Sequence, residues 1–254
     1  MPDPAGIEYV YGVTRSRERP SIRVPGVAGS PVRAVCRADL AALVTRLDRP
    51  LAATAQDVRA HWQVLLETME QTAILPMRFG VMMDNDQAVR EMLLAQNRAR
   101  LAARLDDLHG MVQVTVKGRY NQDLILAHIA SSPHLVRLRD RVRASPGGGT
   151  LLQQIQLGEL VVSELARQRE LDAAEALAAL EPASAGARVE IATGDDAAFN
   201  LSFLVASDRR RRFDRAVGRL RARCLPRIEI RYLGPLPPFS FVDADLSDGV
   251  MAWA

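Results

Sequence analysis

The order of strand and helix patterns in the second half of the chain restricts its fold more than any other feature. Alternating apolar and polar residues predict four strands in this half, at Met111–Lys117, Arg188–Ala192, Phe199–Val205 and Arg227–Leu233. Helical periodicity fills the interval before the second strand and the interval before the fourth. The resulting β-α-β-β-α-β order predicts a ferredoxin-like, or split βαβ, arrangement, in which helices cover one face of a four-stranded antiparallel sheet.

The first helical interval is long enough to form an insertion of its own, at about 121–181. Ser132 has the position of a helix cap, and Ser145–Gly149 has the composition of a flexible break. After the break, Leu151–Leu180 is helical in pattern throughout, although Gly158 interrupts it. We therefore expect one or two packed helices in this stretch.

The first strands and helix of the chain are predicted from shorter patterns. Ile7–Val13 and Val32–Arg37 carry β-branched and aromatic residues and predict paired strands. Asp39 has the position of a helix cap, and the apolar residues after it, Leu40, Leu43, Val44 and Leu47, fall on one helical face. This pattern predicts a short helix.

Two longer helices are predicted in the remainder of the N-terminal half. Thr54 and Asp57 have the spacing of a capping box, and the helix they open carries an apolar stripe of Val58, Trp62, Leu65, Leu66 and Met69. Asp84 is the expected cap of the next helix, which Gly110 would end.

An apolar run, Ala73–Met83, lies between these two helices and reads A-I-L-P-M-R-F-G-V-M-M. Because a strand between helices must be covered on at least one face, we expect an inner strand against which the N-terminal half packs. Pro76 instead favours a sheet edge or the first residues of a strand. Arg78 needs a carboxylate, a carbonyl or a binding partner to meet its charge.

These elements predict an α+β fold of two domains with ferredoxin-like antiparallel sheets packed against helices, and a long helical segment in the C-terminal half. We place an N-terminal α+β domain at 1–110 and a C-terminal ferredoxin-like domain at 111–254. The second domain includes the helical insertion at about 121–181 and an extended, proline-rich closing segment, Gly234–Val242. A chain of 254 residues with 48% hydrophobic and 25% charged residues is ordinary for a globular protein of this kind.

Cysteine usage and hydropathy predict a cytoplasmic protein. Cys36 and Cys224 are far apart in the sequence, which favours two buried thiols in a reducing compartment over a disulfide. The N-terminus lacks a charged region followed by an apolar one, and no window reaches the roughly 18 apolar residues of a membrane span. We therefore expect no membrane partner.

No pattern in the sequence predicts catalysis, a metal or a cofactor. The four histidines, His61, His109, His128 and His134, are scattered without metal-ligand spacing. Nucleophile-elbow, phosphate-loop and dinucleotide-binding motifs are absent. Asp243–Gly249 partly resembles a calcium loop, but its glycine is one position late and the final glutamate is missing, which favours a solvated tail. We expect a protein that is not an enzyme.

Arginines concentrate in one predicted helix, at Arg209–Arg212, Arg215 and Arg219. RNA-recognition modules share the ferredoxin-like strand order, but they stack bases on aromatic residues of a basic, glycine-containing strand. Phe199–Val205 lacks the basic and glycine positions of that strand. The arginines therefore indicate a solvated outer helix face, and we expect no nucleic-acid partner.

Several segments together resemble the gas vesicle accessory (synthesis) proteins of the GvpL/GvpF family, over nearly the whole chain. They are Tyr9–Val13, the His61 helix leading into Ile74–Gly80, Gly110–Lys117, Asn200–Val205 and the closing Gly234–Phe241. The chain departs from the pattern of the family at Leu236, where an aromatic residue is expected, at Phe239, where tyrosine is expected, and at Gln113, where glutamate is usual.

The resemblance implies a non-enzymatic protein, associated with the gas vesicle, that assists assembly of its shell. Its expected partners are the major shell protein and other accessory proteins, and its expected step is nucleation or growth. The candidate partner surface comprises Arg78, Pro235, Pro237, Pro238, Phe239 and Phe241, which could instead serve only to cover the sheets. A small-molecule-binding regulatory module built on ferredoxin-like domains is the alternative.

Overall fold

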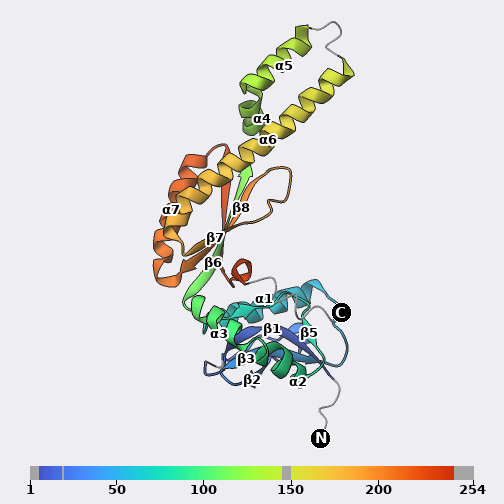
Figure 1. The fold of residues 1–254 in the computed structure, drawn as a ribbon, viewed down its shortest axis with the longest axis vertical. Coiled ribbons are helices and arrows are strands. Elements are labelled where there is room, and N and C mark those ends of the chain that lie inside the picture. The colour runs from blue at the N-terminus through green and yellow to red at the C-terminus, as the bar shows by residue number, and fades with distance from the viewer. Residues whose placement is uncertain (1–5, 19, 145–149, 243–254) are drawn as a thin grey trace. The chain divides into compact units, whose positions relative to one another are not determined.

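The computed structural model describes residues 6–18, 20–144 and 150–242, which form two compact units (Figure 1). The first unit comprises Met1–Gln113, Ala206–Asp208 and Pro235–Ala254, and the second comprises Val114–Val205 and Arg209–Gly234. The closing segment from Pro235, which the sequence analysis assigned to the C-terminal domain, thus belongs to the first unit. The calcium-like stretch Asp243–Gly249 and the break Ser145–Gly149 lie outside the described residues.

The sheet of the first unit is built around β1, Ile7–Arg15. Its strand order is β2-β3-β1-β4, and β5 also pairs with β1. The other strands are β2 (Arg33–Arg37), β3 (Leu40–Leu47), β4 (Leu75–Pro76) and β5 (Met82–Met83), and these strands pair antiparallel. A side chain at Gly12 of β1 would place Cβ 2.6 Å from the Leu75 carbonyl oxygen, so β4 approaches β1 where glycine leaves room.

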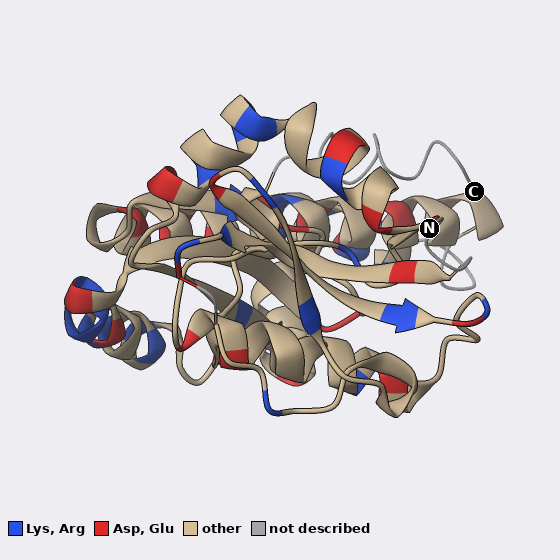
Figure 2. Cartoon of the chain, turned by 90° about the horizontal axis from the view of Figure 1, so that it is seen from below, with Lys and Arg blue, Asp and Glu red and all other residues tan. Residues whose placement is uncertain are grey.

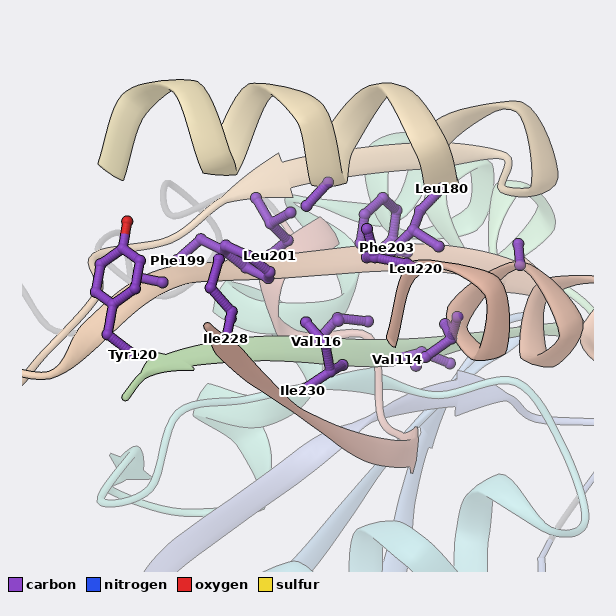
Figure 3. Close-up of a cluster of buried hydrophobic side chains, with 14 of the residues drawn as sticks. Val114, Val116, Tyr120, Leu180, Phe199, Leu201, Phe203, Leu220, Ile228 and Ile230 are labelled. Atoms are coloured by element: carbon purple, nitrogen blue, oxygen red, sulfur yellow. The ribbon is translucent and has the colours of Figure 1, made fainter. Parts of the chain in front are cut away.

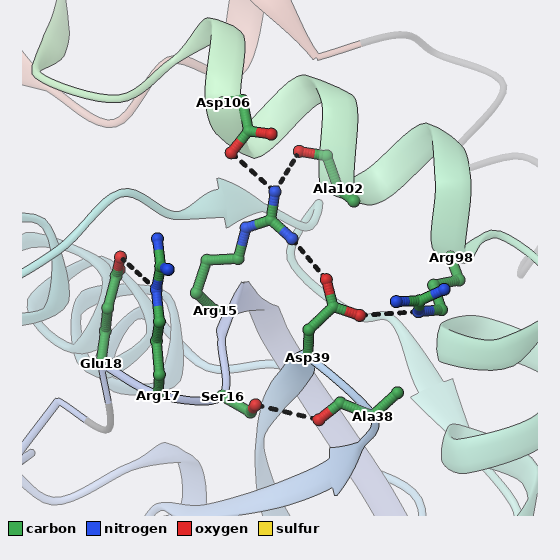
Figure 4. A network of polar contacts seen from close by, with 9 residues as sticks. All are labelled: Arg15, Ser16, Arg17, Glu18, Ala38, Asp39, Arg98, Ala102 and Asp106. Atoms are coloured by element: carbon green, nitrogen blue, oxygen red, sulfur yellow. Dashed lines mark hydrogen bonds and ion pairs between the residues drawn. The ribbon is translucent and has the colours of Figure 1, made fainter.

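The prediction of a short helix over Leu40–Leu47 is wrong, because this stretch is the strand β3. It lies between β1 and β2, and all of its residues except Arg46 are buried. A strand covered on both faces loses the alternation of apolar and polar residues, so its pattern also fits a helix. Asp39 caps no helix. It lies in the turn between β2 and β3, and its carboxylate accepts hydrogen bonds from Arg15 and Arg98 (Figure 4).

Arg15 joins this hairpin to helix α3, Arg98–Asp107 (Figure 4). Its guanidinium donates to Asp39 Oδ2 at 2.5 Å, to Asp106 Oδ1 at 2.6 Å and to the Ala102 carbonyl at 2.9 Å. Charge-assisted bonds to several acceptors fix the orientation of an arginine side chain more firmly than a single ion pair does. The arginine therefore holds the last turns of α3 against the sheet of the first unit.

Helix α1, Ala55–Met69, begins with the predicted capping box of Thr54 and Asp57. Its buried face is rotated from the predicted stripe. His61 is buried there, whereas the predicted Val58 is 39% exposed and Trp62 is half-buried. A polar histidine in the core explains the error, because hydrophobic periodicity does not count it as an inner residue.

The helix predicted to start at Asp84 is interrupted. Asn85 caps α2 (Asp86–Ala88) in place of Asp84, its side chain accepting a hydrogen bond from the Ala88 amide. A π-helical stretch, Val89–Ala95, follows before α3. The Asn97 side-chain amide donates to two carbonyls of that stretch, at 3.0 Å each, and so closes the wide turn. Gly110, at φ 70°, ends the segment as predicted.

The second sheet has the order β7-β8-β6-β9, which is that of the split βαβ arrangement. Its strands are β6 (Met111–Tyr120), β7 (Gly186–Val189), β8 (Ala197–Ala206) and β9 (Ile228–Leu236). Its helices are α4 (Gln122–Ala130), α5 (Pro133–Ala144), α6 (Leu151–Leu180) and α7 (Arg210–Cys224). The predicted α+β class, with two antiparallel sheets and a long C-terminal helical segment, is confirmed.

The core of the second unit lies between this sheet and the helices α6 and α7 (Figure 3). Val116, Leu201, Phe203, Leu180 and Leu220 are each at most 1% exposed in it. Helix α6 is continuous through Gly158, and its N-terminal part exposes apolar residues such as Leu151 and Val162.

A buried ion pair ties α6 to the strands. Asp172 accepts two hydrogen bonds from Arg227, at 2.6 and 2.7 Å, and one from the Tyr120 hydroxyl at 2.7 Å. Burial alone would raise the pKa of Asp172, but the bonds from Arg227 and Tyr120 lower it below its ordinary value. The carboxylate therefore stays ionised although it is 5% exposed.

The two cysteines are both free thiols, but only one of them is even partly covered. Cys224 is half-buried and Cys36 is exposed, so the prediction of two buried thiols is wrong for Cys36. It lies on β2, an edge strand of the sheet, in which Val35 is the one buried residue. Among the described helices, none combines the length and the hydropathy that a membrane crossing requires.

Candidate partner surface of the first unit

The run Ala73–Met83 follows β1 along the edge of its sheet and is not the single inner strand that we predicted. It forms two short strands, β4 and β5, with a loop between them. Met77 N–H donates to the Tyr11 carbonyl at 2.8 Å, and Val10 N–H donates to the Val81 carbonyl at 2.9 Å, so β1 holds the run on both sides of the loop. Pro76 fits an edge position because it has no N–H to donate.

A cluster of aromatic rings anchors the loop from below. The rings of Tyr9, His61 and Phe79 lie with centroids 5.7 to 5.9 Å apart, and Tyr11 stacks on His61 at 5.5 Å. The Gly80 amide donates to the Tyr9 hydroxyl at 3.2 Å, and that hydroxyl lies 2.8 Å from His61 Nδ1. The Tyr9 hydroxyl therefore contacts both the loop and helix α1.

His61 is held neutral in this cluster. Burial lowers its pKa to about 4, and a backbone contact with Met77 acts in the opposite direction without overcoming the burial. The ring is 1% exposed, so His61 is a structural residue that connects α1 to the loop.

Arg78 is exposed, whereas the residues on either side of it in the loop are held by the rest of the first unit. Met77 is 1% exposed, Phe79 is half-buried against the aromatic cluster, and Gly80 takes φ 95°, a conformation that favours glycine. Arg78 itself is exposed. Of the candidate residues, it is therefore the one whose side chain the structure presents to solvent.

The closing segment packs on α1. Pro237 and Pro238 are buried, whereas Pro235, Phe239 and Phe241 are half-buried. The Phe239 ring lies 5.1 Å from the Trp62 ring, and the Ser240 amide donates to Gln113 Oε1 at 2.9 Å. An amide oxygen at position 113 accepts this bond, as the glutamate of the family pattern also could.

One hydrophobic cluster contacts both parts of the candidate surface, the loop that carries Arg78 and the closing segment. Phe79 and Phe239 both pack against one hydrophobic cluster, which includes Tyr9, Val64 and Leu65. The contacts of Tyr9, His61 and Trp62 with Phe79 and Phe239 were not predicted, because nothing in the spacing of these residues shows which segment each ring meets. The aromatic residues of Tyr9–Val13 and around His61 indicate that these segments are packed, but not what they pack against.

Two clefts open on the first unit. One, of about 210 Å³, is lined by Ile74, His109, Met111 and Pro238 among others. The other, of about 450 Å³, is lined by residues that include Gly26, Asp57, Arg59 and Gln63. Within the described ranges, no group of three or more histidine, cysteine, aspartate or glutamate residues is placed to hold a metal ion.

Comparisons with known proteins agree on one family. The family model for "Gas vesicle synthesis protein GvpL/GvpF" matches residues 8–243. Gas vesicle protein F of a Streptomyces species is 34% identical over 240 residues, which cover 92% of this chain and 99% of that protein. Gas vesicle protein F of Haloferax mediterranei is 28% identical, with 92% of each chain covered.

Solved structures show the same fold. The crystal structure of GvpF from Anabaena sp. superposes with a TM-score of 0.83 at 22% identity, covering 94% of this chain and 98% of that one. GvpF from Microcystis aeruginosa gives a TM-score of 0.76, also at 22% identity, with 94% and 99% covered. With a family model that spans nearly all of the sequence, the chain belongs to the gas vesicle synthesis protein GvpL/GvpF family.

Proposed function

We propose that this chain is a non-enzymatic accessory protein of gas vesicle assembly, which binds the major shell protein, other accessory proteins or both during nucleation and growth. The support comes from membership of the GvpL/GvpF family and from relatives named gas vesicle protein F. In this proposal the protein acts in the cytoplasm, in association with the vesicle.

The loop that carries Arg78 is the observation on which this function depends most. Its backbone is held at both ends by β1, and its aromatic and glycine residues are engaged by Tyr9 and His61. Because the backbone of this loop is already held, a partner that binds Arg78 has to order only its side chain, and arginine is enriched at such contact points.

Capture of candidate partners by the purified chain tests the proposal. The wild-type protein should retain the major shell protein or an accessory protein. Arg78→Ala should weaken that capture about tenfold or more, at a temperature at which both proteins are fully folded. Arg49→Ala, at another exposed arginine of the same unit, is the matched control and should bind as the wild type does. Failure to capture any gas vesicle protein, together with normal vesicles after deletion of the gene, would sink the proposal.

For the closing segment, the same assay separates two roles. The half-buried positions of Pro235, Phe239 and Phe241 fit either a cover for the first unit or a contact site. If Phe239→Ala lowers stability but its folded fraction still binds the partner, the closing segment serves to cover the first unit. Weakened capture by a variant of normal stability identifies a contact.

The alternative function, a small-molecule-binding regulatory module, is favoured by one observation. The cleft beside Gly26 and Asp57, at about 450 Å³, falls within the size range of small-molecule sites. Thermal-shift measurements with a panel of nucleotides and amino acids test it, and a uniform absence of stabilisation across the panel would count against it.

A further inference from the structure

Helix α7 has two chemically different faces. Phe213, Ala216, Val217 and Leu220 are buried in the core of the second unit. The outer face carries Arg211, Arg212, Arg215 and Arg219, all exposed, which we term the arginine stripe. The stripe follows from helical geometry, because positions three and four apart share a face.

No residue in the described part of the chain forms a hydrogen bond or ion pair with any arginine of the stripe. Other arginines of the helix are engaged, since Arg223 pairs with Glu175 at 2.9 Å and Arg221 donates to the Ile230 carbonyl at 3.3 Å. Asp214, the acidic residue of α7, accepts a hydrogen bond from the Tyr232 hydroxyl at 2.5 Å.

Like charges four residues apart repel one another and destabilise a helix by about 0.2–0.5 kcal/mol per pair. Arg211 and Arg215 form one such pair, and Arg215 and Arg219 form a second. The stripe therefore costs the folded chain stability without adding to its core, which is a pattern expected of a binding surface.

The spacing of the stripe fits a helical partner. Arg211, Arg215 and Arg219 recur every four residues and extend over about 12 Å along α7. Gly218 lies beside them, and a Cβ added there would meet nothing within 4 Å. Because glycine inside a helix costs about 1 kcal/mol relative to alanine, its position is informative. It opens the surface between arginines so that another backbone can approach closely.

We propose that the arginine stripe binds an acidic helical segment of a protein partner, whose carboxylates repeat at the same four-residue spacing. This inference rests on the proposed function, since it assigns a second surface, on the second unit, to partner binding. Arginine suits this role because its guanidinium forms paired hydrogen bonds with a carboxylate.

The same features argue against a nucleic acid or a lipid surface as the occupant. Three aromatic residues of the second sheet, Tyr120, Phe199 and Phe203, are at most 5% exposed and cannot stack on bases. The fourth, Tyr232, is half-buried and donates its hydroxyl proton to Asp214 of α7. Acidic and basic residues are interspersed over the chain, whose formal net charge is +3 (Figure 2). The small Gly218 lies beside the stripe, where membrane-surface helices carry large apolar residues.

A designed peptide tests the stripe directly. The probe is a labelled alanine-based helix of about 20 residues with glutamate at every fourth position, and its counterpart carries glutamine there. The full-length wild type should bind the glutamate peptide more weakly as salt rises, and it should not bind the glutamine peptide. The triple variant Arg211→Gln, Arg215→Gln, Arg219→Gln should lose about tenfold or more in affinity.

Two variants control for charge and for folding. Arg137→Gln, Arg141→Gln, Arg143→Gln on α5 removes three charges from exposed arginines of the same unit and should bind as the wild type does. Arg211→Lys, Arg215→Lys, Arg219→Lys keeps the charge and should retain most of the binding. An equal loss in the α5 variant, equal binding of the glutamine peptide, or tighter binding of duplex DNA or of phosphatidylglycerol vesicles would overturn the inference.

Capture of gas vesicle proteins then separates this inference from the proposed function. If the wild type captures a partner and the stripe variant captures it equally well, the inference is wrong and the function stands. If the wild type captures none, the function fails, while the peptide titration still decides what the stripe binds.

Discussion

His61 is buried among aromatic rings, and at the scale of single residues this burial determines its charge. Its pKa is about 4 in the folded protein, against about 6.5 in an unfolded chain. The unfolded state therefore takes up a proton first as pH falls. The stability that neutral His61 provides is complete above pH 6.5 and is lost progressively between pH 6.5 and 4, by up to about 3 kcal/mol.

His61→Leu should flatten the dependence of the free energy of unfolding on pH between 6.5 and 4, because it removes the group that titrates there. Urea unfolding at several pH values measures this slope. His109→Gln, at an exposed histidine of the same unit, should leave the slope as in the wild type. An unchanged slope in His61→Leu would show that other groups control the acid sensitivity.

Glu8 and Arg33 form a second residue-scale test. Glu8 is 1% exposed and pairs with Arg33 at 2.6 Å, and Arg33 also pairs with Asp86 at 2.6 Å. Burial raises the pKa of Glu8, and Arg33 partly offsets this. Arg33→Gln should cost about 3 kcal/mol, because it removes the arginine that pairs with this buried carboxylate and leaves only the weaker attraction of Arg46.

Adding Glu8→Gln to that variant should recover much of the loss, since the buried charge is then gone. The free energies of unfolding of the two single variants and the double variant measure this coupling. Additive losses would mean that the pair contributes little.

At the scale of elements, the effect of replacing a glycine depends on its backbone conformation. Gly80 takes φ 95° with open space around its Cβ direction, whereas Gly158 lies inside α6, also with open space. Gly80→Ala should destabilise by about 1 kcal/mol or more because alanine is strained at that φ. Gly158→Ala should stabilise by about 0.5–1 kcal/mol, and chemical denaturation measures both. Equal effects of the two substitutions would contradict the assignment.

The elements that the sequence predicted well are those with local end signals. Helix α6 was predicted from Leu151 to Leu180 because it follows a flexible break and ends before Pro182. Strand β3 was predicted as a helix because burial on both faces removes the alternation of apolar and polar residues. Ala73–Met83 was predicted as one strand, but a loop that contains Gly80, at positive φ, divides it. Local pattern does not contain the neighbours that decide such cases.

The candidate surface shows the same division. Arg78 and the closing prolines stand out in the sequence as unusual residues in apolar segments. The residues that surround them in the fold cannot be read from the sequence. The contact between Trp62 and Phe239, for example, joins positions that are 177 residues apart (239 − 62). Contacts over such separations depend on the whole fold, which no spacing rule records.

At the scale of the whole molecule, the two units have separate hydrophobic cores. Trp62 belongs to the first unit, and the chain has one other tryptophan, Trp253. In a Trp253→Phe background, tryptophan fluorescence therefore reports on the first unit, while far-ultraviolet circular dichroism also reports on α6 and α7.

Two substitutions should then affect different signals. Phe239→Ala removes an aromatic contact of Trp62 and should lower the fluorescence midpoint, by about 1 kcal/mol in stability. Asp172→Asn weakens the buried pair with Arg227. It should lower the stability measured by circular dichroism by about 2 kcal/mol or more and leave the fluorescence midpoint unchanged. If both variants shifted both signals equally, the units would unfold as one.

The closing segment has a consequence for how the protein is made. The first unit contains both the N-terminal 113 residues and the residues from Pro235 onward, so the second unit is inserted within it. A ribosome synthesises the chain in one direction, and the complete sequence of the second unit emerges before Phe239 can reach Trp62. A chain that stops between Gly234 and Phe239 thus contains every residue of the second unit but lacks the contact between Phe239 and Trp62 in the first unit. Completion of the first unit therefore requires synthesis to continue beyond the last residue of the second unit.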